Sequence, residues 1–159
     1  MAQFDTHNYL KTTSAFNIQA ISSDTTTVGN IIDTLGYDSV EIIFHTGTLD
    51  ATTVFTPVIQ ESDDSTFATG VVTTPTAELI GTTNVVEPRP DYASPAVSAL
   101  ADVTFTGVAQ SNLTARIGVL NKHRYVRVSI VTTLHTTGGT ISAIAAMAYP
   151  AHLPTPKDK

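Results

Sequence analysis

Side chains that branch at the β-carbon constrain this chain's fold more than any other feature of the sequence. The 159 residues include 28 Thr and 15 Val. Both residue types lose rotamer freedom in a helix and pack well on the pleated surface of a sheet. Glu and Lys, which coiled coils and long helices use in quantity, are scarce. The composition therefore predicts an all-β protein.

The charge and cysteine content exclude several further classes. Charged residues make up 14% of the chain, against about 25% in an average globular domain. Intrinsic disorder requires low hydrophobicity and high net charge, whereas this chain is 42% hydrophobic with a net charge of −6. Because there is no Cys, disulfide frameworks and Cys-based zinc sites are excluded. We expect a folded protein that assembles in a reducing compartment. The sequence shows no secretory signal and no apolar run of membrane-spanning length.

The apolar pattern predicts eight or nine short strands. The clearest is 124–134, in which Val126, Val128 and Ile130 alternate with outward-facing residues, as in a half-buried antiparallel strand. The run 39–45 carries apolar residues on both faces, which predicts a central strand, and the Ala-rich run 141–149 predicts close packing on both faces. Gly138 and Gly139, between the runs 124–134 and 141–149, predict a β-hairpin there. Short strands at this spacing are typical of an antiparallel β-sandwich or a closed barrel.

The chain reads as one domain with three additions. Residues 1–15 show no clear period and predict an extended N-terminal arm, and 16–150 predict a single β-sandwich domain. Within that domain, 82–102 contain three Pro and predict a loop that leaves the core, since a loop of this length is unusual in a compact domain. Residues 151–159 predict an extended C-terminal tail.

Positive and negative charges are divided unevenly along the chain. Residues 1–102 hold 13 of the 14 acidic residues and two basic ones, whereas 103–159 hold six basic residues and one acidic one. One interpretation is that an acidic face of one copy meets a basic face of another. The other is that strands from both halves interleave and the charges mix. The acidic total argues against a nucleic-acid partner, which usually selects a basic domain.

No catalytic or metal-binding motif stands out, and we expect no enzymatic activity, cofactor or metal. The five His include no pair at metal-ligand spacing, although His45 and His135 could meet across strands. The run 61–65 resembles a solvated hairpin tip more than a calcium loop, because the alternating-acid pattern is missing. The one basic concentration is Lys122, Arg124 and Arg127 with the intervening His123. It reads either as a docking patch for an acidic surface or as a solvated turn followed by an outward Arg.

Several short motifs occur in an order that resembles a known group of proteins. They are Asp24–Thr27, Ile32–Val40, Glu41–Phe44, Val58–Asp64, Leu79–Gly81, Asn121–Val128 and Tyr149–His152. This order resembles the small virion proteins of tailed bacteriophages that decorate or cement the head. The resemblance covers roughly residues 16–152, and the stretch 82–102 is longer than the pattern.

The resemblance implies a jelly-roll-like β-sandwich that binds the lattice of the major capsid protein as a homo-oligomer. A trimer would fit the three-fold positions of such a lattice. It also implies a location on the virion head after assembly in the host bacterial cytoplasm, with no catalysis and no membrane partner.

The arm and the 82–102 loop are the segments that a compact core does not need, so we expect them to reach partners. With the basic concentration, they supply the candidate capsid or subunit contacts: Phe4, Tyr9, Lys11, Arg89, Tyr92, Lys122, Arg124 and Arg127. The alternative function is a receptor- or glycan-binding module of a phage fibre or spike. The absence of Trp and an aromatic content of 7% argue against it.

Overall fold

The computed structural model describes residues 10–75, 78–81, 104–133 and 137–150. In these ranges the chain forms β-strands and a short 3₁₀ helix. Their bounds are β1 (Leu10–Ile21), β2 (Thr25–Asp33), β3 (Tyr37–Leu49), β4 (Val54–Ser62), β5 (Val72–Thr73), β6 (Leu79–Gly81), β7 (Phe105–Thr106), η3 (Val108–Gln110), β8 (Thr114–Val119), β9 (Tyr125–Thr133) and β10 (Gly139–Pro150).

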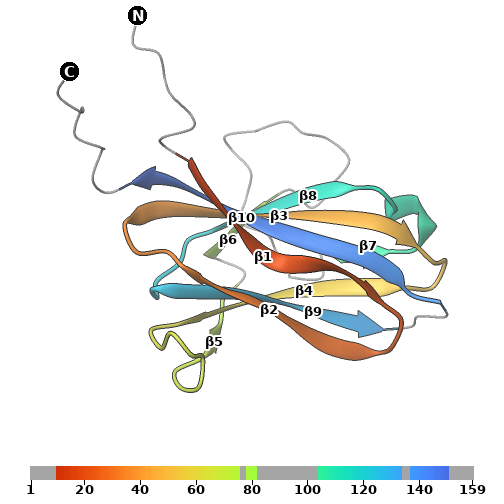
Figure 1. The fold of residues 1–159 in the computed structure, drawn as a ribbon, viewed down its shortest axis with the longest axis horizontal. Helices are drawn as coiled ribbons and strands as arrows, with labels where there is room; N and C mark the ends of the chain where they lie inside the picture. Colours follow the sequence, from red (N-terminus) through yellow and green to blue (C-terminus); the bar gives the residue numbers. More distant parts are fainter. Residues whose placement is uncertain (1–9, 76–77, 82–103, 134–136, 151–159) are drawn as a thin grey trace, which may run out of the picture.

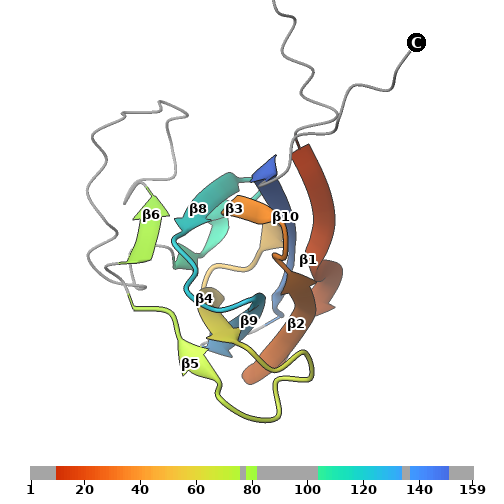
Figure 2. The same cartoon turned by 90° about the vertical axis from the view of Figure 1, so that its left-hand side faces the viewer.

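The strands form two sheets that pack face to face (Figures 1 and 2). Sheet A has the order β1-β10-β3-β8-β6, and sheet B has the order β2-β9-β4-β5, with β7 paired to β4. Neighbouring strands in both sheets are antiparallel. The predicted all-β, antiparallel β-sandwich is therefore confirmed.

Consecutive strands mostly lie in opposite sheets, which corrects the predicted hairpin at Gly138–Gly139. The strands on either side of these glycines are β9, in sheet B, and β10, in sheet A. Gly138 has φ +89°, and a Cβ there would lie 2.1 Å from the carbonyl oxygen of Ile21. The two glycines thus allow the chain to pass close to another backbone as it crosses between sheets, and the partner of β9 is found elsewhere in the sequence.

The strand order confirms the position predicted for one strand and shows how a proline is accommodated in another. The run 39–45 lies in β3, between β10 and β8, so it is a central strand as predicted. Pro57, which cannot donate to a ladder, lies in β4, where β9 pairs along one side. On the other side β7 pairs with Val54 and Phe55, and β5 pairs with Gln60 and Glu61. Pro57 therefore occupies the gap between these two short strands.

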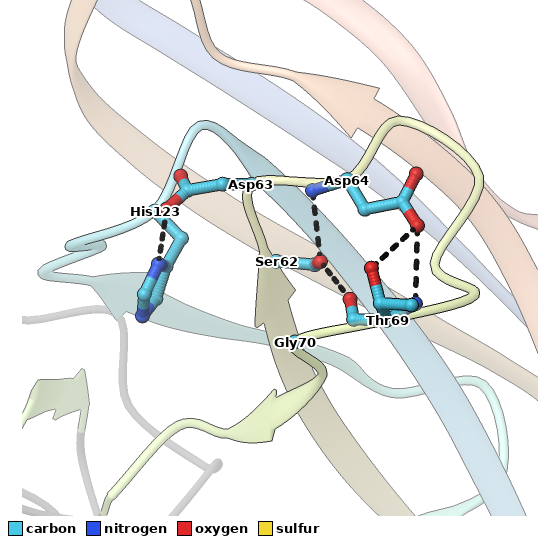
Figure 3. Close-up of a pocket in the computed structure, with 6 residues that line it drawn as sticks. All are labelled: Ser62, Asp63, Asp64, Thr69, Gly70 and His123. Carbon is cyan, nitrogen blue, oxygen red and sulfur yellow. Dashed lines mark hydrogen bonds and ion pairs between the residues drawn. The ribbon is translucent and has the colours of Figure 1, made fainter.

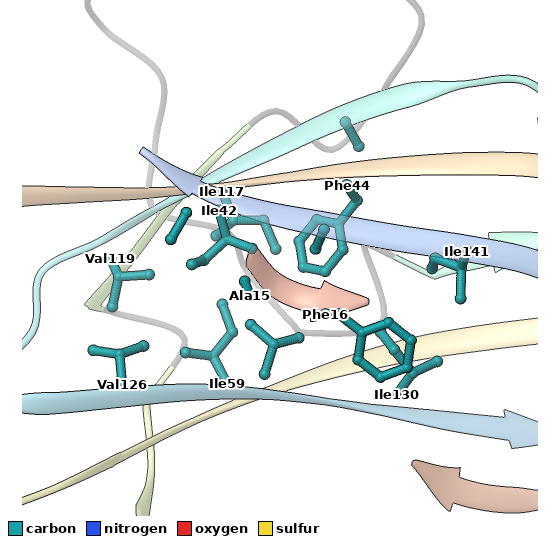
Figure 4. Close-up of a cluster of buried hydrophobic side chains, with 14 of the residues drawn as sticks. Ala15, Phe16, Ile42, Phe44, Ile59, Ile117, Val119, Val126, Ile130 and Ile141 are labelled. Atoms are coloured by element: carbon teal, nitrogen blue, oxygen red, sulfur yellow. The ribbon is translucent and has the colours of Figure 1, made fainter. Parts of the chain in front are cut away.

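The hydrophobic core lies between the two sheets (Figure 4). Ile42 and Phe44 on β3 face Ile59 on β4 and Ile130 on β9, and all four are fully buried. Burying each such side chain stabilises the fold by about 1.5–3 kcal/mol. The core thus joins residues that are distant in the sequence, as expected of a sandwich.

The boundary of the predicted N-terminal arm is partly corrected. Residues 10–15, which were assigned to the arm, lie in β1 and pair with β10, and Ala15 is buried in the core. The repeated polar residues of this segment concealed its strand character. Residues 1–9, the 82–102 loop and the 151–159 tail lie outside the described residues.

Candidate interaction surface

The described candidate contact residues gather at one end of the sandwich, which lies at the left of Figure 1. We call it the turn end and define it by the turn 34–36, the turn 120–124 and the loop 63–71. Lys122 and Arg124 lie in the second turn, and Arg127 follows in β9. Lys11, at the start of β1, places its Nζ 5.6 Å from the centre of the Tyr37 ring. Phe4, Tyr9, Arg89 and Tyr92 lie outside the described residues.

The two turns are bonded directly to each other. The backbone N–H of Thr34 donates to the carbonyl oxygen of Arg124 at 3.0 Å, and the Thr34 hydroxyl donates to the same oxygen at 2.7 Å. The side-chain amide of Asn121 donates to the Thr34 hydroxyl and to the His123 carbonyl, both at 3.1 Å. These bonds fix the turn 120–124 against the turn that precedes β3.

Arg124 is held by a bidentate ion pair with Asp33. Its Nε and NH2 donate to the two carboxylate oxygens of Asp33 at 3.0 and 2.8 Å, and its guanidinium lies 4.9 Å from the centre of the Tyr125 ring. These side-chain hydrogen bonds are the main reason that the pKa of Asp33 falls to about 2. The same contact raises the pKa of Arg124. The pair is fixed in place, as bidentate geometry favours.

Lys122 and His123 of the same turn also contact acids from the first half of the chain. Lys122 forms an ion pair with Glu78, and His123 Nδ1 lies 3.0 Å from Asp63 Oδ2. Glu61 is only 2% exposed, and its carboxylate accepts from the backbone N–H groups of Lys122 and His123 at 2.8 and 3.2 Å. The interpretation that charges from the two halves mix is thus correct for these pairs.

Arg127 has a packing role within the described residues. Its NH2 donates to Gln60 Oε1 at 2.8 Å, and its guanidinium lies 4.4 Å from the centre of the Phe67 ring. Phe67 is buried beneath the 63–71 loop with φ +55°. Arg127 therefore anchors this loop to β9, and its Nε is buried with no hydrogen-bond partner among the described residues.

A surface pocket of about 330 Å³ lies beside the turn, lined by Ser62, Asp63, Asp64, Thr69, Gly70 and His123 (Figure 3). The Asp64 carboxylate accepts hydrogen bonds from the backbone N–H groups of Thr66, Ala68 and Thr69. Bonds from the backbone and hydroxyl of Thr66 are the largest cause that lowers the pKa of Asp64 to about 2. The polar groups that line the pocket therefore mainly stabilise the 63–71 loop.

The prediction of a solvated hairpin tip at 61–65 is wrong at its start. Glu61 and Ser62 belong to β4 and are buried. Glu61 is needed inside because it satisfies backbone donors of a turn that is sixty residues away in the sequence. The hydroxyl of Thr74 also donates to it, at 2.7 Å. No local pattern distinguishes this acid from its exposed neighbours.

Two exposed leucines at the turn end were missed by the sequence reasoning. Leu35 is 66% exposed and Leu120 is 54% exposed. They lie in the two turns that the Thr34–Arg124 bonds hold together. Their signal in the sequence is weak: Leu35 is a single apolar residue before Gly36, and Leu120 simply continues the apolar strand run that ends before Asn121. Together they place exposed apolar side chains in turns whose basic residues, Lys122 and Arg124, already have acidic partners.

Comparisons with known proteins do not name a family for this chain. No protein-family model matches it, and no curated protein matches it. Within the described ranges, no group of three or more His, Cys, Asp or Glu could hold a metal ion. In the same part of the chain, no helix is long and apolar enough to cross a membrane. His45 lies 3.1 Å from the Thr114 hydroxyl, while its suggested partner His135 lies outside the described residues.

Proposed function

We propose that this protein is a bacteriophage virion component that decorates the head and stabilises it by binding the assembled lattice of the major capsid protein. The observation that carries the proposal is the turn end. There the exposed Leu35 and Leu120 lie in turns fixed by bidentate and backbone bonds. A rigid surface loses little side-chain entropy on binding. Because Arg124 and Lys122 already have acidic partners, a docked lattice would meet few unpaired charges.

The strand order supports the finer description of the fold as a jelly roll. The sequence β1-β10-β3-β8 in one sheet and β2-β9-β4 in the other matches an eight-stranded double-sheet roll if β5 and β7 together supply the eighth strand. Fold alone does not define function. Its role here is to bring the start of β1, the end of β10 and both leucine-bearing turns to one end.

The proposed mechanism is clamping by an oligomer on the virion head, after assembly in the host cytoplasm. Each copy would bury area on neighbouring capsid subunits, and a trimer would fit the three-fold positions of the lattice. A protein that binds the assembled shell, and not the separated subunits, stabilises the shell by mass action. Heads carrying the protein would therefore resist heat better than bare heads.

A binding assay with matched variants tests this proposal. Purified protein is mixed with bare heads of the phage that encodes it, and occupancy is measured after sedimentation. We expect wild type to bind and the double variant Leu35→Asp/Leu120→Asp to lose most of its occupancy. The control is Val108→Asp, because Val108 is 62% exposed at the opposite end. Equal occupancy of all three proteins, or no binding by wild type, would contradict the proposal.

The receptor- or glycan-binding alternative makes a different prediction for the same protein. It requires binding to host cells or to a glycan array in the absence of heads. Glycan sites favour exposed aromatics, but Tyr37 is partly buried against the core and has Lys11 over its ring. Glycan binding without head binding would favour this alternative over decoration.

A further inference from the structure

The outer face of sheet A has unusual composition for a solvated sheet surface. Its central residues lie side by side in β10 and β3, where Ile144 pairs with Ile43 and Ala146 pairs with Glu41. Ala148 continues the row toward the strand end. An antiparallel sheet with one solvated face usually carries polar residues there. Here the outward positions of the two central strands hold two Ile and two Ala beside Ser, Glu and His.

This face is distinct from the core. Ile144 is 45% exposed, whereas Ala146 is only 9% exposed and lies outside the buried cluster between the sheets. The same strands carry the core on their other side through Ile42, Phe44 and Ala145. The sequence pattern of β3 and β10 therefore predicts packing on both faces, whereas the described residues leave Ile144 on the outer face 45% exposed.

The charges on this face are self-complementary. Glu41 and Arg116 are the acidic and basic residues at its outward positions, and their side chains pair at 3.3 Å. Both side chains remain partly exposed. When a surface meets an identical surface across a two-fold axis, residue i of one copy contacts residue j of the other, and j contacts i. Glu41 of each copy can then meet Arg116 of its partner, so the contact joins opposite charges twice.

The size of the face suits such a contact. The strands β1 and β10 have 12 residues each, β3 has 13 and β8 has 6, and they lie in one layer (Figure 2). With usual strand spacing and rise, their flat footprint is roughly 650 Å². Side-chain relief adds accessible area to this value. A stable protein interface buries about 800 Å² per partner, which is close to what this face offers.

We propose that the outer face of sheet A binds a second copy of this chain, back to back across a two-fold axis. The apolar centre at Ile43 and Ile144 supplies the buried area, and the Glu41–Arg116 pairs set the register. This contact goes beyond the proposed function and is separate from a three-fold arrangement on a capsid. It is tested on the purified protein without heads, so its failure would not count against head binding.

A charge-swap mixing experiment tests the contact. The variant E41R places two basic residues on the face, and R116E places two acidic ones. We expect wild type to contain a dimer of twice the 16.8 kDa chain mass, measured by light scattering and sedimentation velocity. Each variant alone should lose the dimer, because like charges would meet across the axis. An equimolar mixture of the two variants should regain it as a heterodimer.

The mixture separates the proposed contact from a folding defect, because a misfolded variant would not regain association. Circular dichroism checks that each variant is folded. Thr56→Lys, on the outer face of sheet B, serves as a control that should leave the dimer intact. The proposal is overturned if wild type is monomeric at its highest soluble concentration, if E41R alone assembles like wild type, or if the mixture stays monomeric. A monomer would mean that solvent or another segment of this chain covers the face.

Discussion

The two ends of the sandwich are held together by different means. At the turn end, acids from β2, the 63–71 loop and the segment before β6 pair with the basic residues of one turn. At the opposite end, Asp50 accepts hydrogen bonds from the backbone N–H groups of Thr53 and Gly138, and Gly138 lies against the backbone of Ile21. One end thus depends on pairs of side chains, and the other depends on one carboxylate that accepts backbone hydrogen bonds and on close backbone packing. The first suits a binding surface, whereas the second suits closure of the fold.

The largest effect should come from a matched pair of glycine substitutions. Gly36 at the turn end and Gly138 at the opposite end have nearly equal φ values of +87° and +89°, but a Cβ at Gly36 meets nothing within 4 Å. We expect Gly36→Ala to destabilise the protein by about 1 kcal/mol, from left-handed backbone strain alone. Gly138→Ala should destabilise it by about 3 kcal/mol or more, because backbone atoms must also move. Denaturant unfolding measures both, and equal losses would contradict the packing difference.

The second-largest loss of stability should come from replacing Glu61, the buried acid of the turn end. Glu61→Gln replaces one of the two acceptor oxygens with an amide nitrogen, which cannot accept a hydrogen bond. Either the backbone N–H groups of Lys122 and His123 or the Thr74 hydroxyl then lose their acceptor. We expect a loss of about 2 kcal/mol, the usual cost of a buried donor left unpaired. Hydrogen exchange should quicken at 122–123 more than at Gly138. Uniform quickening at both ends would show that the turn end is not a separate unit.

Acid should weaken the turn end through Asp33. The folded pKa of Asp33 is about 2, mainly because Arg124 donates hydrogen bonds to it, and an unfolded Asp has a pKa of about 3.9. A lowered folded pKa contributes stability that is present above pH 4 and is lost as the pH falls through 2. Denaturant unfolding of wild type and Asp33→Asn should therefore differ at pH 6 and converge near pH 2. A difference that persists at pH 2 would mean that Asp33 acts through packing and not through its charge.

The smallest effect on stability should come from the exposed apolar residues. Leu35→Asp and Val108→Asp change side chains that are largely in solvent at the two ends, so each should shift the free energy of unfolding by no more than about 0.5 kcal/mol. Thermal unfolding scans check this. A large loss of stability in Leu35→Asp would show that Leu35 contributes to folding. Reduced head binding by the double variant could then not be attributed to a lost contact.

The sequence predicted the class of fold but not the pairing of its strands. The alternation of Val126, Val128 and Ile130 reflects burial on one side of a strand, which a local pattern records directly. The partners of β9 are β2 and β4, which lie far from it in the sequence, so the two glycines after β9 were misread as a hairpin. Strand pairing depends on how the whole core closes, and turn residues alone do not encode it.

The candidate surface was predictable only in part. The basic turn was visible because Lys122 and Arg124 lie close together in the sequence. Its partners Asp33 and Glu78 are separated from it by 91 and 44 positions, and only the crossing between sheets brings them together. The exposed leucines were equally hard to recognise, because Leu35 is a single apolar residue in a turn and Leu120 reads as the end of a strand.

Electron cryo-microscopy of heads saturated with the protein tests the central claim most directly. We predict density for the sandwich on the outer surface of the shell, with the turns 34–36 and 120–124 against the capsid lattice and the opposite end, at Asp50 and Gly138, facing away. A bound protein with the opposite end toward the shell would contradict the assignment of the binding surface. Heads that carry no density for the protein would contradict decoration itself.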